Sequence, residues 1–254
     1  MIADAQLPTA VDLTSVVAAE PDPLLFATVS GAHLYGFPSQ DSDVDLRGVH
    51  LLPAEALVGL REPTQTRSRM WDANGVEMDL VTHDLRKFVR LMLRRNGYVL
   101  EQLLSPFVVH TSQAHAELVA LAPGVITRHH AHHYRGFAGT QWRLHEKTGE
   151  LKPLLYAFRV LLTGIHLMRT GEVQADLPTL HREVAPELGY LPDLIAAKAA
   201  AEHGPAPVRR TQVAADLDAL HVLLDEAQDA SRLPDAPTAY DALHDLVVRA
   251  RLEG

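Results

Sequence analysis

The chain contains no cysteine, so disulfide bonds and thiolate-ligated metal sites are excluded from any account of its function. Long apolar runs are also lacking, and no stretch approaches the roughly 20 residues that a membrane-spanning helix needs. The N-terminus has no basic segment followed by an apolar core, so a signal peptide is not expected. Together these absences favour a cytoplasmic protein without a membrane partner.

Basic residues are in the minority, with 23 Lys and Arg against 32 Asp and Glu and a formal net charge of −9. This balance argues against bulk electrostatic attraction to nucleic acid, although it leaves room for a local basic groove. The length of 254 residues and the hydrophobic fraction of 47% are those of a globular chain. Such a chain forms one large domain or two small ones.

The stretch that carries chemistry spans residues 31–49 and reads GAHLYGFPSQDSDVDLRGV. An apolar run at residues 24–29 precedes it and predicts a buried strand. Strict alternation over residues 41–47 predicts a second strand, with one face carrying Asp41, Asp43, Asp45 and Arg47. Three carboxylates on one face repel each other unless a cation neutralises them, so this face suits a divalent metal bound by hard oxygen ligands. A solvated acidic strand is the alternative interpretation.

A further acidic strand follows a hairpin signal. Asn74-Gly75 favours the positive φ angles of a tight turn, and residues 76–82 then predict a strand. By alternation, Glu77 and Asp79 share one face of that strand. Two carboxylates are therefore available on a second strand.

On these residues the sequence resembles the nucleotidyltransferases of the DNA polymerase beta superfamily. The Tyr35-Gly36, Ser42-Asp43-x-Asp45 and Arg47-Gly48 elements resemble, within that superfamily, the nucleotidyltransferases linked to RNA repair pathways. The resemblance implies an α+β fold. A small mixed sheet with flanking helices is expected in a nucleotidyltransferase domain at residues 1–107, and an α-helical domain that covers the cleft at residues 108–254.

The resemblance also implies the ligands of two Mg²⁺ (or Mn²⁺) ions, which would be Asp43, Asp45 and Asp79. Asp43 and Asp45 are expected to bind both ions. Asp79, with Glu77 as the alternative, is expected to bind the ion at the nucleophile and to help deprotonate it. The same three aspartates are the expected catalytic residues, with a nucleoside triphosphate as substrate.

The expected nucleotide-binding residues are Gly31, Ala32, His33, Ser42, Arg47, Lys152 and Arg159. A glycine turn lets backbone amides approach phosphates closely. Arg47 either clamps a phosphate or pairs with Asp41. Arg159 either binds triphosphate or is a structural surface arginine. One residue departs from the superfamily pattern, because Ala32 stands where a serine is usual, so the hydroxyl that touches a nucleotide phosphate is missing.

The remaining pattern is helical. Helices are expected over residues 85–104 with a break at Asn96-Gly97, and over residues 153–169, 191–202, 213–233 and 239–252, while residues 61–68 read as a polar loop. His129 and His133 have the i,i+4 spacing of a metal pair without an identifiable third ligand, so a surface or substrate-facing role is favoured.

The leading functional hypothesis is transfer of a nucleoside monophosphate from an NTP to a hydroxyl, with an RNA or tRNA end as the acceptor that the family suggests. The alternatives are a small-molecule or protein adenylyltransferase, and a catalytically silent module that binds nucleotide or RNA. The sequence predicts nothing about the oligomeric state.

Overall fold

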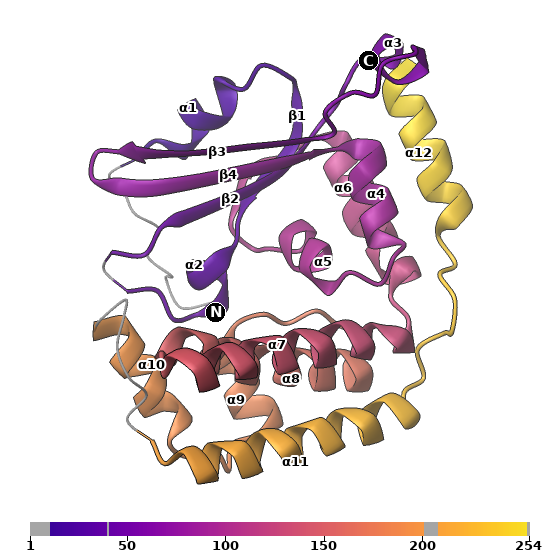
Figure 1. The fold of residues 1–254 in the computed structure, drawn as a ribbon. Coiled ribbons are helices and arrows are strands. Elements are labelled where there is room, and N and C mark those ends of the chain that lie inside the picture. The colour runs from indigo at the N-terminus through magenta and orange to yellow at the C-terminus, as the bar shows by residue number, and fades with distance from the viewer. Residues whose placement is uncertain (1–10, 40, 201–207, 253–254) are drawn as a thin grey trace. The chain divides into compact units, whose positions relative to one another are not determined.

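The computed structural model describes residues 11–39, 41–200 and 208–252, and the chain forms two compact units (Figure 1). Unit 1 comprises Met1–Leu34, Asp43–Val125 and Ala236–Gly254, and unit 2 comprises Tyr35–Ser42 and Ile126–Asp235. Both units are therefore discontinuous in sequence. The functional division expected at residue 107 stays a prediction.

Unit 1 is built on a mixed sheet whose five strands lie in the order β3-β4-β2-β1-β5. Strand β2 runs parallel to β4, whereas β1 is antiparallel to β2 and β5, and β3 is antiparallel to β4. The strands are β1 (Leu24–Val29), β2 (Val44–His50), β3 (Thr66–Ala73), β4 (Val76–Asp84) and β5 (Val108–His110). The predicted α+β class is confirmed.

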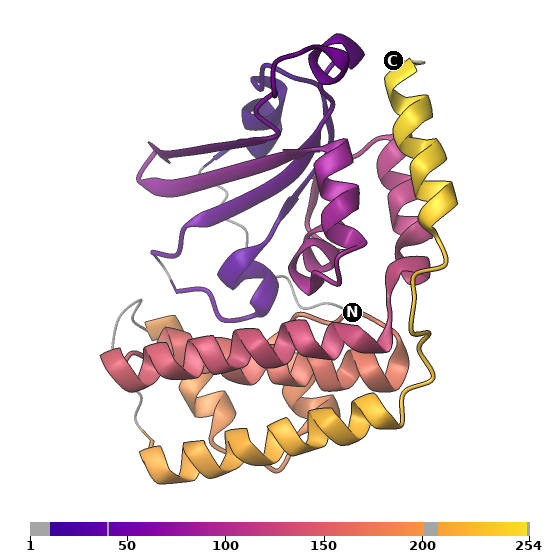
Figure 2. The same ribbon diagram turned by 45° about the vertical axis from the view of Figure 1, so that its right-hand side comes forward.

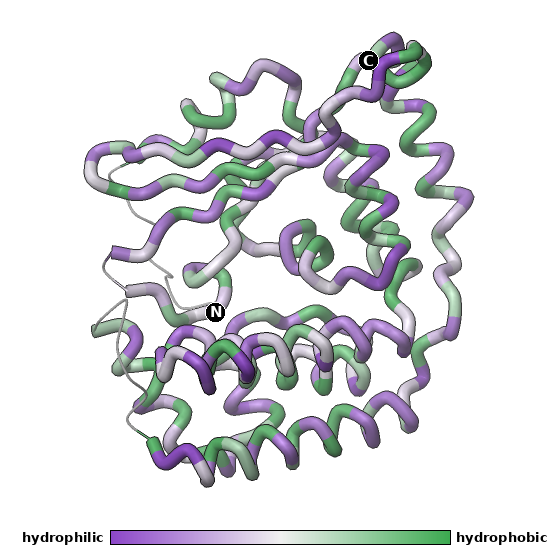
Figure 3. Tube along the Cα trace, viewed as in Figure 1, coloured by the Kyte–Doolittle hydropathy of each residue, from purple (hydrophilic) through white to green (hydrophobic). Residues whose placement is uncertain are grey.

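Strands β2 and β4 alternate between apolar and polar residues, as the change of colour along β4 illustrates (Figure 3). Their apolar side chains form a core cluster with at most 2% exposure, made of Val29, Val44, Leu46, Met78 and Leu80. Because successive strand residues point to opposite faces, this packing directs the acidic side chains of both strands to the other face.

Short helices surround the sheet: α1 (Leu13–Ala18), α2 (Gly31–Tyr35), α3 (Ala54–Val58), α4 (Leu85–Met92), α5 (Gly97–Leu103) and α6 (Gln113–Leu121). The Asp84 carboxylate accepts the Arg86 backbone N–H and caps α4. The Asn96 side chain accepts the Tyr98 backbone N–H and caps α5, so the predicted helix break at Asn96-Gly97 is confirmed.

The last helix, α12 (Tyr240–Leu252), belongs to unit 1 and runs alongside α4 and α6 (Figures 1 and 2). Two ion pairs attach it. Arg251 Nη2 donates to Asp84 Oδ2 at 2.5 Å, where neither side chain is more than 8% exposed. Arg249 Nη2 donates to Glu117 Oε2 at 2.8 Å in a much more exposed pair.

Unit 2 is helical and is organised around α8 (Leu151–Thr170). Its other helices are α7 (Ala131–Thr148), α9 (Leu177–Val184), α10 (Leu191–Ala200), α11 (Arg210–Asp229) and the 3-10 turn Arg128–His130, whereas the 3-10 turn Ala122–Val125 belongs to unit 1. Gly171 ends α8 with a left-handed φ of +79°. By length and composition alone α8 is apolar enough to cross a membrane, but 83% of its most apolar window is buried inside the protein.

The segment Tyr35–Ser42 packs within unit 2 through buried cations. The Arg159 guanidinium lies 3.7 Å from the centre of the Tyr35 ring and is 2% exposed. The Lys198 ammonium is fully buried and donates to Ser39 Oγ at 3.1 Å. The predicted helix end at Glu202 lies outside the described residues.

Two local predictions were wrong, and two short elements were missed. Residues 66–68, expected in a polar loop, begin β3, because they pair along their length with residues 81–83 of β4. Helix α2 and the three-residue strand β5 were not predicted. Asp41 and Asp43 lie before β2 rather than on it, since the Ser42 hydroxyl accepts the Ser39 N–H and the chain turns there.

Candidate functional site

Two carboxylates face each other across the parallel strands β2 and β4. The register pairs Asp45 with Asp79, and both lie on the polar face of the sheet. Their side chains are 17% and 22% exposed. Because neighbouring strands are only about 4.8 Å apart, the two negative charges repel each other unless a cation lies between them.

Arg47 supplies that cation from the same face of β2, two residues after Asp45. Its Nη2 donates to Asp45 Oδ1 at 2.5 Å and to Asp79 Oδ2 at 2.8 Å. Its Nη1 donates to the carbonyl oxygens of Leu46 and Asp79, and its Nε donates to the Tyr98 hydroxyl at 3.2 Å. A guanidinium has five N–H donors, so every donor of Arg47 is used.

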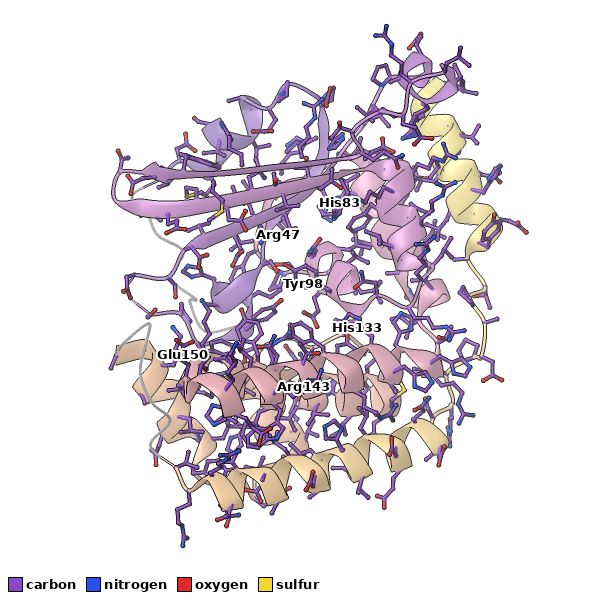
Figure 4. The ribbon with its side chains drawn as sticks, in the orientation of Figure 1. Arg47, His83, Tyr98, His133, Arg143 and Glu150 are labelled. Atoms are coloured by element: carbon purple, nitrogen blue, oxygen red, sulfur yellow. The ribbon has the colours of Figure 1, made fainter. Side chains whose placement is uncertain are left out.

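This arrangement fixes the charge state of the arginine. Figure 4 labels Arg47 on β2 and Tyr98 on α5. Burial opposes the charged form, but the neighbouring phenol and carboxylates outweigh it and raise the pKa of Arg47 above its ordinary value. The predicted pairing of Arg47 with Asp41 is not found in the described part of the chain, and Asp45 and Asp79 take its place.

The glycine turn lies directly against the same carboxylate. Gly31 has a φ of +63°, and a Cβ at this position would lie 1.7 Å from Asp45 Oδ2. The Ser30 backbone N–H also donates to the Asp45 carbonyl at 2.8 Å. Only glycine combines this backbone conformation with so close an approach, which explains why the turn needs it.

Polar atoms with no hydrogen-bond partner among the described residues gather at this turn. They are the hydroxyl oxygen of Ser30 and both ring nitrogens of His33, whose residues are at most 5% exposed. Burial lowers the pKa of His33, and the negative charge of Asp43 opposes that shift. Buried polar atoms of this kind ordinarily have a partner, so the turn is able to accept the polar atoms of a ligand.

The other predicted carboxylates lie differently. Asp43 is half-buried one residue before β2, and Asp41 is exposed in the preceding turn. Glu77 is exposed near the start of β4 and is paired in register with Asp72 of β3, away from β2. Asp79 is therefore the β4 carboxylate that the sheet brings to Asp45.

The oxygen donors at Asp45 and Asp79, with Asp43 nearby in sequence, match the ligand chemistry of Mg²⁺ or Mn²⁺. Yet the described residues contain no group of three or more potential ligands already gathered around one point. Arg47 instead binds one oxygen of each opposed carboxylate. The residues fit a metal ion, provided that Arg47 shares the carboxylates with it.

The remaining predicted nucleotide-binding residues are divided between the two units. Ala32 is buried in α2 of unit 1, and its methyl group offers no hydroxyl. Ser42, Lys152 and Arg159 lie in unit 2. Lys152 is half-buried near the start of α8. Arg159 is buried under aromatic rings, so its description as a surface arginine was wrong.

Sequence reasoning missed Lys198. Its fully buried ammonium holds Ser39, whose hydroxyl lies 2.9 Å from that of Ser42. The sequence did contain a signal for this residue. Leu191, Leu194 and Lys198 share the buried face of α10, and a lysine at an apolar position of a helix is unusual.

The histidine cluster gathers no metal ligands in the part of the chain that the structure describes. His129 Nε2 lies 3.4 Å from Asp235 Oδ1, and its ring stacks on His132. The His133 ring contacts Tyr134 and Phe137. A role in metal binding is not supported by these contacts.

Comparison with known proteins decides the family. The sequence model of RlaP, the RNA repair pathway DNA polymerase beta family, matches residues 7–249. The chain belongs to this family. It is 29% identical over 219 residues to the protein MJ0002 of Methanocaldococcus jannaschii, covering 84% of this chain and 88% of that protein.

More distant similarities accompany this match. The chain is 32% identical over 94 residues to the protein YcgL of Bacillus subtilis, covering 37% of this chain and 35% of YcgL. A nucleotidyltransferase-like protein from Exiguobacterium sibiricum is 12% identical, covers 86% of this chain and 72% of its own, and has a TM-score of 0.33. That likeness is too distant to locate a site. The RlaP family and the mixed sheet identify the chain as a nucleotidyltransferase of the polymerase beta type.

Proposed function

We propose that the chain transfers a nucleoside monophosphate from an NTP to a hydroxyl group, with an RNA or tRNA end as the acceptor. The observation that supports it most directly is the pair of opposed carboxylates on β2 and β4 beside the Gly31 turn. The family match supports the same reaction class. The proposal includes the cytoplasmic location that the sequence predicts.

In this proposal the acceptor oxygen attacks the α-phosphorus of the NTP. The bond between the α- and β-phosphates breaks, pyrophosphate leaves, and Asp79 accepts the proton of the hydroxyl. One or two Mg²⁺ or Mn²⁺ ions held by Asp43, Asp45 and Asp79 would stabilise the charge on the phosphates when bound.

The nucleotide phosphates are proposed to lie against the Gly31 turn. There the Ser30 hydroxyl and the His33 ring nitrogens have no hydrogen-bond partner among the described residues. Backbone amides of the glycine turn are proposed to approach the phosphates beside them. Ala32 donates nothing from its side chain, so its neighbours would replace the usual serine hydroxyl. Ser42, Lys152 and Arg159 are proposed as further nucleotide-binding residues.

The test is incubation with each α-labelled NTP, Mg²⁺ or Mn²⁺ and a pool of tRNA. We expect the wild-type protein to label RNA and Asp79→Asn to lose at least 100-fold in rate. Glu77→Gln is a matched control, because it neutralises a carboxylate on the same strand that is exposed and paired away from β2. It should keep the wild-type rate.

The result also separates the alternatives. In parallel incubations with a protein or an aminoglycoside in place of tRNA, labelling of either one instead of RNA would favour the adenylyltransferases. NTP binding without transfer to any acceptor would favour a silent binding module, for which Ala32 is the supporting observation. Ala32→Ser then provides a gain-of-function test, with tighter NTP binding expected if the missing hydroxyl limits affinity, by about fivefold for one hydrogen bond of about 1 kcal/mol.

A further inference from the structure

Arg47 occupies the position between Asp45 and Asp79 where a cation is needed. Its Nη2 reaches one oxygen of each carboxylate, at 2.5 and 2.8 Å. We propose that Arg47 is an internal counter-cation, so that a divalent ion and the guanidinium compete for this carboxylate pair. The inference rests on the proposed function, since it concerns the ion that nucleotidyl transfer would use.

The surroundings make the competition strong. The three side chains are between 9% and 22% exposed, so the attraction and the repulsion among them are screened less than in water. A divalent ion that approaches both carboxylates also meets the positive charge of Arg47. Binding of the ion therefore requires that Arg47 release at least one of its two charge-assisted hydrogen bonds.

The remaining contacts keep the guanidinium close after such a release. Two of its donors are bound to the carbonyl oxygens of Leu46 and Asp79, and a third is bound to the Tyr98 hydroxyl. These three partners do not carry the carboxylate charges. Because the guanidinium is planar and rigid, turning Nη2 away from the carboxylates also breaks the Tyr98 bond at Nε, whereas the two carbonyl bonds at Nη1 act as the pivot. Arg47 thus stays beside the site, and its donors to the carboxylates become available to another anion.

The same geometry disfavours Arg47 as a ready-made phosphate clamp. All five of its N–H groups are already used by partners within unit 1. A phosphate would have to displace one of them. An ion that takes over the carboxylates frees these donors first, so ion binding and phosphate binding at Arg47 should support each other.

The test measures Mn²⁺ affinity of the full chain by electron paramagnetic resonance, without nucleotide. Arg47→Gln removes the positive charge, and we expect it to bind Mn²⁺ at least tenfold more tightly than the wild type. Arg69→Gln is the matched control, because it removes one positive charge from β3, where Arg69 pairs with the distant Glu20. Its Mn²⁺ affinity should equal that of the wild type. Adding Asp79→Asn to Arg47→Gln should abolish the gain.

A less disruptive variant tests the same proposal if Arg47→Gln does not fold. Tyr98 is 37% exposed, so Tyr98→Phe should preserve the fold while it removes the hydrogen bond to Arg47 Nε. We expect Mn²⁺ binding about threefold tighter, as the loss of one hydrogen bond implies. Unchanged or weaker Mn²⁺ binding in the folded variants would overturn the proposal, as would a gain that Arg69→Gln shares.

Failure of this inference is distinct from failure of the proposed function. Nucleotidyl transfer by the wild type with unchanged Mn²⁺ affinity in the Arg47 variant would refute the competition alone. Tighter Mn²⁺ binding by Arg47→Gln without any transfer by the wild type would refute the proposed reaction alone.

Discussion

Two arginines on the terminal helix α12 form ion pairs, one buried and one exposed. Comparing them tests how much burial adds to the contribution of an ion pair to stability. Arg251 pairs with Asp84, and the two side chains are 8% and 0% exposed. Arg249 pairs with Glu117, and these side chains are 51% and 30% exposed. Both substitutions to alanine remove the same side chain from the same helix.

The expected magnitudes differ because burial differs. Loss of one partner of a buried pair costs about 3–5 kcal/mol, since the other charge stays buried without compensation. Asp84 keeps two backbone N–H partners, from Leu52 and Arg86, so we expect the lower end, about 3 kcal/mol, for Arg251→Ala. An exposed pair is worth roughly 0.2–1 kcal/mol, so Arg249→Ala should cost less than about 1 kcal/mol.

The assay is urea unfolding followed by tryptophan fluorescence. The chain has two tryptophans, Trp71 on β3 of unit 1 and Trp142 on α7 of unit 2. In a Trp142→Phe background, Trp71 reports on unit 1 alone. Equal losses for Arg249→Ala and Arg251→Ala, or a loss below about 1 kcal/mol for Arg251→Ala, would refute the role assigned to burial.

Three further predictions concern the turn, a histidine and a helix cap. Gly31→Ala should lower the free energy of unfolding by about 1–3 kcal/mol, because alanine is strained at a positive φ; melting curves measure this loss. It should also abolish transfer in the labelling assay, because the new Cβ displaces the Asp45 carboxylate. Burial, reinforced by nearby positive charge, lowers the pKa of His83 to about 4, so the unfolded chain binds a proton that the folded chain does not. The free energy of unfolding should therefore gain a contribution as pH rises from about 4 to 6.5, and NMR should show a neutral His83 ring at pH 5. Asn96→Ala should cost about 1 kcal/mol in urea unfolding, since it removes the cap of α5, while Asn96→Ser should keep most of the stability.

The two faces of strand β2 could be predicted from the sequence. Its alternation of carboxylates with buried valine and leucine follows from the period of a strand, so the polar and apolar faces of β2 were predictable. The strand itself begins later than predicted, at Val44, because the turn at Ser39 and Ser42 is set by side-chain hydrogen bonds that alternation does not reveal.

The pairing of Arg47 with Asp79 could not be predicted from the sequence pattern. Asp79 is 32 residues away, and only the lateral register of β2 against β4 decides that it lies opposite Asp45. That register depends on the packing of both strands, not on the local pattern of either. The strand β5 was also not predictable, because it has only three residues and weak periodicity.

Because unit 1 includes Ala236–Gly254, it cannot be completed until all of unit 2 has been translated. Synthesis runs from the N-terminus, so on the ribosome the sheet is made first and has to wait for its last helix while the residues of unit 2 emerge. During that interval Asp84 lacks Arg251 and the surfaces of α4 and α6 that α12 covers are exposed. A nascent chain stalled before residue 236 should therefore be the form most dependent on chaperones.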